Sequence, residues 1–409
     1  MITFHWWPNR PDVAIALVAG WVCLVPAVAW GFQSDAEQVI DSAVKFLLAK
    51  QADDGAWHSE HYGAMKQGAA NTSLILYALS HLRPDELQQH SEAIQRAAAF
   101  LQPGIKRNGC VANPEGSLDY PIYSTAMVLT VHKRIGLGLK PLQVEAMIKY
   151  LLDSQCTNRR GFDDQNPNQG GWDILGPGST GGKTSGANVS VTFYVVEALV
   201  AYQATSDGVE AGVEKEKPGH KKIELSNELA QKVDVALAAA SRWCQRIVER
   251  SPDGGFYFTS EHKSLLNKAG WRDKTRTAPL AYGTPTCDGL GVLLKLATEP
   301  DDNAVSRSVD WLENRPDVDV VPGFKSSADD IGWPSSLKFY YLAALSRSLS
   351  QFEQEKARSI REAITQQLVE AQLVSGAWKN DSSRMRENDV LIATPLGLIA
   401  ILNCRPNSK

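Results

Sequence analysis

Residues 253–296 contain the stretch that decides the fold, with DGGF at 253–256 and AYGTPTCDGLGVLLKL at 281–296. The first segment follows a helix-like stretch that ends near Glu249, and its glycines and aromatic residue are typical of a tight turn. The second segment begins with small residues and becomes apolar, as expected of a buried helix. The same order of amphipathic helix, turn and apolar helix recurs along the chain, which indicates an array of repeats.

Six turn signals mark these repeats: Gly55-Ala56-Trp57, Gly109-Cys110, Gly161-Phe162, Gly255-Phe256, Gly323-Phe324 and Gly376-Ala377-Trp378. The steps between their first glycines are 54, 52, 94, 68 and 53 residues, so three of the five steps share a period and the two long ones require insertions. One insertion is the Glu, Lys, Gly and Pro-rich run at about residues 205–222, which is expected to be a solvated loop.

Two kinds of helical segment flank the turns. The segments before the turns have apolar residues at three-and-four spacing, as at 36–51, 143–155, 232–247 and 357–372. The segments after the turns are apolar nearly all round, as at 71–82, 123–135, 188–202, 287–297, 335–349 and 390–402. Six pairs of an outer amphipathic helix and an inner apolar helix predict an all-α fold, an (α/α)6 toroid. An open solenoid of helix pairs is the alternative, but the long segments between helices favour the closed ring.

The N-terminal residues predict export. Arg10 precedes an apolar run over 13–29 that ends in Ala27-Val28-Ala29, a pattern typical of a cleaved signal peptide at 1–29. An uncleaved membrane anchor is the alternative for this short run. We therefore expect a protein of the periplasm or cell envelope, with the toroid over residues 36–404.

Charge and cysteine content narrow the functional classes. A net charge of −4 gives no electrostatic basis for binding nucleic acid. Beyond residue 29, the five cysteines are widely spread and form no C-x-x-C pair, so neither a disulfide framework nor a zinc-type spacing is indicated. The sequence indicates no metal and no cofactor.

The turns resemble those of the squalene/terpenoid cyclase and protein prenyltransferase β-subunit superfamily, whose repeats carry a Q-x-x-D/S-G-x-W/F motif. Gln51 to Trp57 and Gln372 to Trp378 match this motif, and Pro252 to Phe256 matches it in part. In this motif we expect the aromatic ring to join neighbouring repeats. Exported bacterial prenyltransferase and squalene-oxidase repeat proteins are the most similar branch, through these segments: Gly170-Gly171-Trp172, Asn188 to Phe193, Tyr282 to Gly289, Val309 to Glu313, Phe339 to Leu345 and Glu387 to Thr394. The resemblance spans residues 36–404 and implies the toroid.

The resemblance also implies a cyclase chemistry, in which a D-x-D-D acid protonates an alkene or epoxide. Asp329 and Asp330 keep the last acid pair of this motif, lack its first Asp, and precede an expected inner helix beginning near Trp333. Asp163 and Asp164 form a second, weaker candidate pair; either pair would equally suit a turn or a helix cap.

Five further residues are candidate ligand contacts beside Trp333: Phe193, Asn188, Tyr282, Cys287 and Asp288. Tyr282, Trp333 and Phe193 could stabilise cationic intermediates, although repeat packing alone would also explain such aromatics. Cys287 and Asp288 lie near the position of the prenyltransferase zinc, but residue 285 is Pro where that site needs Asp. Zinc and a CaaX protein substrate are therefore not expected.

These observations lead to one leading hypothesis and two alternatives. The leading hypothesis is a terpene-cyclase-like protein that binds an isoprenoid or other apolar ligand in a central cavity and, if it is catalytic, cyclises or isomerises that ligand. The first alternative is a non-catalytic interaction scaffold of the envelope. The second is a carbohydrate-active enzyme that uses paired carboxylates on the same barrel. An aromatic, dry cavity with one buried acid would favour the leading hypothesis.

Overall fold

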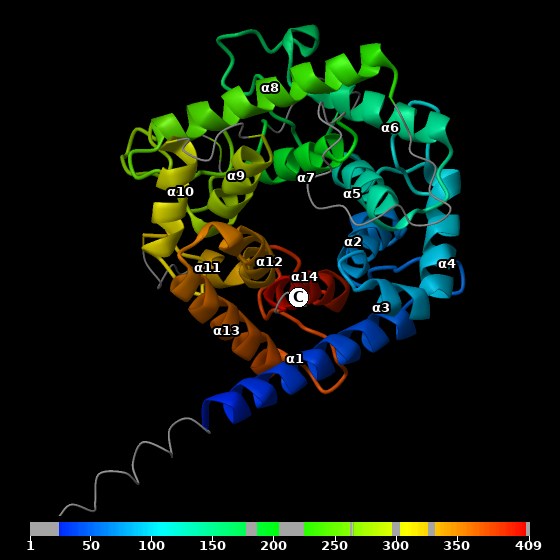
Figure 1. Ribbon diagram of the computed structural model, residues 1–409. Coiled ribbons are helices and arrows are strands. Elements are labelled where there is room, and N and C mark those ends of the chain that lie inside the picture. Colours follow the sequence, from blue (N-terminus) through cyan, green and yellow to red (C-terminus); the bar gives the residue numbers. More distant parts are fainter. Residues whose placement is uncertain are drawn as a thin grey trace, which may run out of the picture.

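The computed structural model describes residues 24–176, 186–203, 225–261, 264, 266–296, 303–325 and 332–405. Its helices form two concentric rings (Figure 1). The outer ring consists of α1 (Leu24–Ala49), α4 (Ser91–Leu101), α6 (Pro141–Ser154), α8 (Asn227–Arg250), α10 (Asn303–Glu313) and α13 (Gln354–Ala371). The inner ring consists of α2 (Ala69–Leu79), α5 (Pro121–Ile135), α7 (Val189–Val200), α9 (Gly283–Leu296), α12 (Lys338–Ser348) and α14 (Val390–Cys404). Two short helices, α3 (Pro84–Gln89) and α11 (Trp333–Ser336), precede α4 and α12.

The inner ring is closed. Each inner helix contacts its two neighbours, and α14 contacts α2, so the last repeat packs against the first. All residues of α2 are buried, whereas α8 buries a single face, which explains why inner segments are uniformly apolar and outer ones amphipathic. The predicted all-α (α/α)6 toroid is confirmed.

Glutamine side chains join neighbouring repeats. Gln51 donates through Nε2 to the Gly55 carbonyl of its own turn and to the Ala93 carbonyl of the next outer helix, at 2.9 Å each. The same two bonds are made by Gln155 to Gly170 and Ala236, and by Gln372 to Gly376 and Val39. Because Val39 lies in α1, the last of these bonds closes the ring.

A glycine of left-handed conformation accompanies each of these turns. At Gly55 (φ 90°) a β-carbon would lie 2.4 Å from the Arg96 carbonyl oxygen of the next outer helix. The same close approach to the next outer helix is made by Gly109 to Ala146, Gly170 to Ala239, Gly254 to Arg307 and Gly376 to Ser42. Only glycine allows both this conformation and this contact between backbones.

Two of the predicted turn signals are misplaced. A β-carbon added at Gly161 would have no neighbour within 4 Å, and Gly170 makes the inter-repeat contact in its stead. Gly323 packs against the Ala281 carbonyl before α9 and not against the next outer helix. The glycine-aromatic pattern alone is therefore insufficient to identify an inter-repeat turn. Such a turn also needs an outer helix that ends where the next repeat comes into contact.

The turn tryptophans connect the two helices of one repeat. The indole N–H of Trp57 donates to the Leu47 carbonyl of α1 at 2.6 Å, and its backbone N–H donates to Thr72 Oγ1 of α2 at 3.2 Å. Trp172 and Trp378 make the same pair of bonds in their own repeats. The hydrogen bonds of these residues therefore join the outer helix to the inner helix, and not one repeat to the next as the motif alone suggests.

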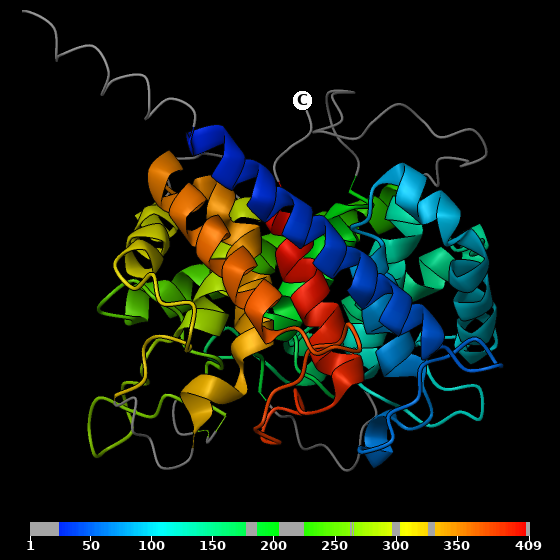
Figure 2. The same cartoon turned by 90° about the horizontal axis from the view of Figure 1, so that it is seen from below.

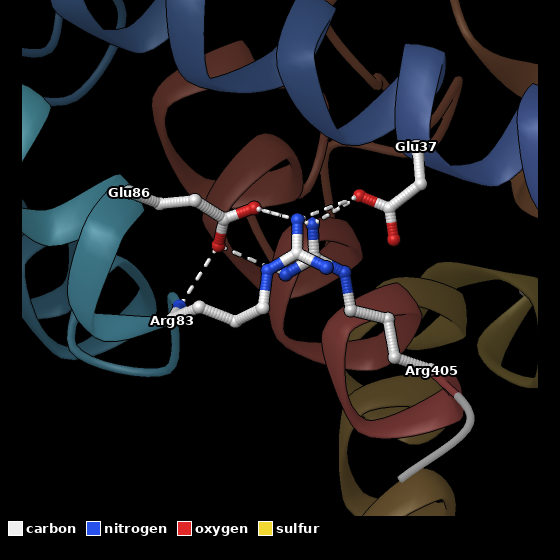
Figure 3. A network of polar contacts seen from close by, with 4 residues as sticks. All are labelled: Glu37, Arg83, Glu86 and Arg405. Carbon is white, nitrogen blue, oxygen red and sulfur yellow. Dashed lines mark hydrogen bonds and ion pairs between the residues drawn. The ribbon is translucent and has the colours of Figure 1, made fainter. Parts of the chain in front are cut away.

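An ion-pair network lies at the seam between the last and first repeats (Figure 3). Arg405, directly after α14, binds Glu37 of α1 at 2.7 Å and Glu86 of α3 at 2.8 Å. Arg83 binds the same two glutamates. Burial alone would raise the pKa of Glu86, but hydrogen bonds and charge from Arg405 and Arg83 lower it. The network adds charge-assisted contacts to the closure made by Gln372.

The ends of several predicted segments lie outside the described residues. Most of the predicted leader and all of the predicted polar insertion at 205–222 lie outside the described residues, while the leader's last residues, from Leu24, are helical in α1. Within the described part of the chain, no helix is both long and apolar enough to cross a membrane.

Candidate functional site

The inner ring contains a cavity of about 140 Å³. Aliphatic and thioether side chains supply most of its lining: Leu74, Met127, Leu337, Met385, Ile392 and Leu396. Three tyrosines, Tyr123, Tyr194 and Tyr340, and one carboxyl group, that of Glu387, complete the lining. The volume is close to the ~150 Å³ of an engineered apolar cavity that accepts benzene, so the space suits a group of about five or six carbon atoms.

The tyrosines form an aromatic wall in their neutral state. The rings of Tyr123 and Tyr194 meet edge to face, with centroids 5.4 Å apart. Burial raises the pKa of Tyr123, Tyr194 and Tyr340 above the ordinary value, so all three remain phenols at neutral pH. The cavity therefore offers π-faces without nearby phenolate charge.

Glu387 is the acid of this cavity, and it lies in the loop before α14. Its Oε1 accepts the backbone N–H of Tyr340 at 2.9 Å, and its Oε2 accepts the backbone N–H of Phe339 at 3.1 Å. Asn380 also donates to Oε2, at 3.0 Å. The carboxyl group thus caps the first turn of α12, where free N–H groups and the helix dipole favour an anion.

Burial nevertheless dominates the acidity of this group. It raises the pKa of Glu387 to about 7, although the three hydrogen bonds from Tyr340, Asn380 and Phe339 act in the opposite direction. A carboxyl group with this pKa exchanges a proton near neutral pH. Oε1 accepts one of these bonds and Oε2 accepts two, so Oε1 is the oxygen with room for a proton.

A buried ion pair lies next to the cavity on α9 and α12. Asp288 accepts hydrogen bonds from Arg347 Nη2 at 2.9 Å and from the Tyr340 hydroxyl at 2.8 Å. Burial raises the pKa of the Asp288 carboxyl, and the Arg347 guanidinium opposes that shift. The guanidinium also lies over the Phe193 ring, 4.3 Å from its centroid. One face of Phe193 is therefore already occupied by a cation.

A second cluster lies at the last turns of the inner helices. Glu197 binds Arg134 and Lys295, each at 3.2 Å, and accepts the Tyr77 hydroxyl at 2.6 Å. Burial alone would raise the pKa of Glu197, but Lys295, Arg134 and Tyr77 lower it to about 2. Burial, followed by Arg134, lowers the pKa of His81 to about 3, so this imidazole is neutral.

These two clusters tie five inner helices together at one end of the ring. Arg134 and Lys295 stand in the last turns of α5 and α9, and Arg347 stands in the last turn of α12. Cations are favourable at these helix C-termini. Asp288 and Glu197 each have a cationic partner, so the clusters close this end of the ring with satisfied carboxylates.

The structure places the predicted acids away from the cavity lining or does not describe them. Asp329 and Asp330 lie outside the described residues. Asp163 and Asp164 lie exposed in a turn, where Asp163 accepts the Gln165 N–H at 3.1 Å and Asp164 accepts the Gln169 side chain at 2.6 Å. Hydrogen bonds of this kind stabilise turns, which is the alternative role given above for this pair of aspartates.

The predicted ligand contacts have identifiable packing partners. Asn188 caps α7 by accepting the Val191 N–H at 3.0 Å. Tyr282 is buried with its ring 5.2 Å from that of Phe324, and burial raises the pKa of the Cys287 thiol.

Trp333 begins α11 and is half-buried, with its ring centroid 5.8 Å from Lys268 Nζ and 5.5 Å from the Arg384 guanidinium. Asp288 and Phe193 contact residues of the cavity lining: Asp288 accepts the Tyr340 hydroxyl, and the Phe193 ring meets that of Tyr194.

Sequence reasoning missed Glu387 as an acid, although the segment from Glu387 to Thr394 carried part of the resemblance. A signal was present, because Glu387 stands two residues before Asp389, which caps α14. A charged residue so close to an apolar inner helix is a candidate for burial. Its partner, the start of α12, comes from another repeat and is not visible in the local sequence.

The described helices form a closed (α/α)6 toroid, which is the fold that the resemblance implies. No protein family profile matches the chain, and no curated protein sequence matches it. The type II terpene cyclase MstE from Scytonema, in its product complex, is similar with a TM-score of 0.58 and 13% identity over 91% of this chain and 98% of that chain.

Two other solved structures are about as similar. A protein from Actinoplanes has a TM-score of 0.55 and 16% identity, over 90% of this chain and 99% of that one. A D-mannose isomerase has a TM-score of 0.55 and 11% identity, over 91% of this chain and 97% of that one. Because a cyclase and a sugar isomerase share this ring, the fold alone does not select the chemistry.

Proposed function

We propose that this protein binds the apolar end of an isoprenoid-type ligand in its central cavity and exchanges a proton with it through Glu387. The observation that carries the proposal is the cavity itself, whose described lining is aliphatic and aromatic except for one carboxyl group. A sugar would need several polar partners in such a site, whereas an apolar chain needs none. The lining therefore supports an apolar ligand.

The cavity volume limits what is held. About 140 Å³ accommodates a group of roughly one isoprene unit and not a folded chain of several units. The proposed ligand is therefore a short isoprenoid, or a longer one that inserts one end. At about 0.8 kcal/mol per CH₂, burying one isoprene unit of five carbon atoms contributes about 4 kcal/mol, which corresponds to binding in the millimolar range.

The proposed chemistry is a proton exchange that leaves the ligand's oxidation state unchanged. The protonated Glu387 carboxyl gives its proton to one alkene carbon, and the π-electron pair forms the new C–H bond. The carboxylate remains hydrogen-bonded to the start of α12, while Tyr123, Tyr194 and Tyr340 face the tertiary cation through their rings. Loss of a proton from a neighbouring carbon to the carboxylate restores Glu387 and yields an isomer.

The test uses the purified full chain in D₂O with geraniol, farnesol and squalene, followed by mass analysis of bound and released lipid. Retained lipid supports the binding function, and deuterium incorporation supports proton exchange. Glu387→Gln should abolish deuterium incorporation while lipid is still retained, and Leu396→Phe should reduce retention by filling the cavity.

Glu370→Gln, on the exposed face of α13, is the matched control and should change neither result. Thermal unfolding verifies that each variant is folded. If the wild-type chain retains no isoprenoid of any length, the binding proposal is wrong, and the scaffold hypothesis takes its place.

A further inference from the structure

A cluster of polar and aromatic residues adjoins the cavity on the side of the loop before α14. Arg386 lies between Met385 and Glu387, which both line the cavity. Its guanidinium stands 5.1 Å from the Tyr62 ring centroid and 5.5 Å from the Tyr120 ring centroid. The cluster thus brings together residues of the first, second and last repeats beside the lining.

Two polar atoms of this cluster are buried without a hydrogen-bond partner: Asp119 Oδ2 and Arg386 Nη1. Asp119 is only 5% exposed, and burial raises the pKa of its carboxyl, while a hydrogen bond from Asn113 and the charge of Arg386 act in the opposite direction. Among the ion pairs of the described residues, none joins the two side chains. Buried polar groups of native proteins are nearly always satisfied by protein, ordered water or ligand, so this buried acceptor and buried donor are free to bind a further group.

The backbone at the cluster is strained. Tyr120 has φ 48° and Arg386 has φ 65°, a left-handed conformation that is unfavourable for a non-glycine residue. The loop is held in place by the Tyr62 hydroxyl, which donates to Asn388, and by the Ser59 hydroxyl, which donates to Asp389. These bonds hold the loop in which the Arg386 guanidinium stands beside the rings of Tyr62 and Tyr120.

We propose that Asp119 and Arg386 bind the hydroxyl group of an isoprenoid alcohol whose apolar part occupies the cavity. A hydroxyl group has both functions that the cluster lacks: it accepts from Arg386 Nη1 and donates to Asp119 Oδ2. The cluster and the cavity lie close together, since the Tyr120 ring meets that of Tyr123, which lines the cavity, at 6.5 Å between centroids.

The local charges argue against an anionic headgroup. Arg386 is one cation, while Asp119 and Asp389 are two carboxyl groups in or next to the cluster, and Glu115 also acts on Asp119; Glu387 adds no charge, because it is the protonated acid of the proposed reaction. A diphosphate would add two or more negative charges to this surplus. A neutral group with one donor and one acceptor meets no such repulsion.

This inference rests on the proposed binding of isoprenoids. A series of ligands tests the hydroxyl-binding site separately from isoprenoid binding itself. The full chain is titrated by calorimetry with geraniol, geranyl methyl ether, 2,6-dimethyl-2,6-octadiene and geranyl diphosphate. Geraniol should bind at least tenfold more tightly than the hydrocarbon and more tightly than the methyl ether, which cannot donate. The diphosphate should bind most weakly.

Two variants connect the preference to the cluster. Asp119→Asn and Arg386→Gln should each reduce geraniol affinity about tenfold or more and leave hydrocarbon affinity within about twofold. Asp164→Asn and Arg384→Gln, an exposed aspartate and an exposed neighbour in the same loop as Arg386, are the matched controls and should change neither affinity.

The outcomes are distinguishable. Equal binding of geraniol and the hydrocarbon, or tighter binding of the diphosphate, would overturn the hydroxyl site while isoprenoid binding stands. Absence of binding by all four compounds would overturn the proposed function itself. The wild-type ligand series decides the question even if a variant fails to fold.

Discussion

Replacing Glu387 with Gln should change how stability depends on pH. The folded protein raises the pKa of this carboxyl from 4.5 to about 7, so between these values the folded state holds a proton that the unfolded chain has released. The wild-type free energy of unfolding therefore falls as the pH rises through this window and levels off above pH 7. At 1.36 kcal/mol per pKa unit, the contribution of Glu387 amounts to roughly 3 kcal/mol.

Glutamine does not titrate, and it loses one acceptor at the start of α12, which costs about 1–2 kcal/mol at every pH. The stability of the variant relative to wild type should therefore improve by roughly 3 kcal/mol between about pH 4.5 and about pH 8. Urea denaturation followed by circular dichroism, at constant ionic strength, measures this difference. Glu370→Gln on α13 is the control, because that side chain is exposed.

A difference between variant and wild type that stays constant within about 1 kcal/mol over this pH range would refute the reasoning. It would mean that Glu387 has an ordinary pKa, and thus that water reaches the carboxyl group. The proton-exchange proposal would then lose its acid, whereas ligand binding would stand.

Three further predictions concern the ring and its buried charges. Gly376→Ala should lower the free energy of unfolding by more than about 3 kcal/mol, because its β-carbon would lie 2.3 Å from a backbone oxygen of α1. Gly161→Ala, at a similar φ but in open space, should lower it by about 1 kcal/mol. Equal losses for the two variants in urea denaturation would contradict this prediction. Arg347→Ala should lower the free energy of unfolding by about 3–5 kcal/mol, because it removes the cationic partner of the Asp288 carboxylate. In a double-mutant cycle, adding Asp288→Asn to this variant should restore much of the lost stability. Arg405→Ala should lower the free energy of unfolding by about 1–2 kcal/mol near neutral pH. The loss should shrink in thermal unfolding as the pH falls below 4.5 and through the lowered pKa of Glu86 (Figure 3), and a pH-independent loss would argue against the ion pairs.

In the view along the plane of the ring, the outer helices α1 and α13 lie on either side of the inner helix α14 (Figure 2). Outer and inner helices alternate in sequence, and each turn connects neighbours in space. Gln51 and Gly55 sit in one turn and contact the next outer helix, so a short local motif reports an inter-repeat contact. Gly161 shows that the motif can mislead, because it has the sequence of the turn but no neighbouring helix within 4 Å of its β-carbon position.

By itself, then, the sequence determined the ring. Its helix pairs, their inner and outer faces and the Gln-Gly-Trp turns follow from periodicity and from backbone contacts that only glycine permits. The acid of the cavity required the tertiary structure, since the pKa of Glu387 depends on burial and on Phe339 and Tyr340 of another repeat. The same holds for Phe193, whose aromatic face is covered by Arg347 from α12. Desolvation and inter-repeat pairing act across the ring, and neither is visible in the spacing of residues along the chain.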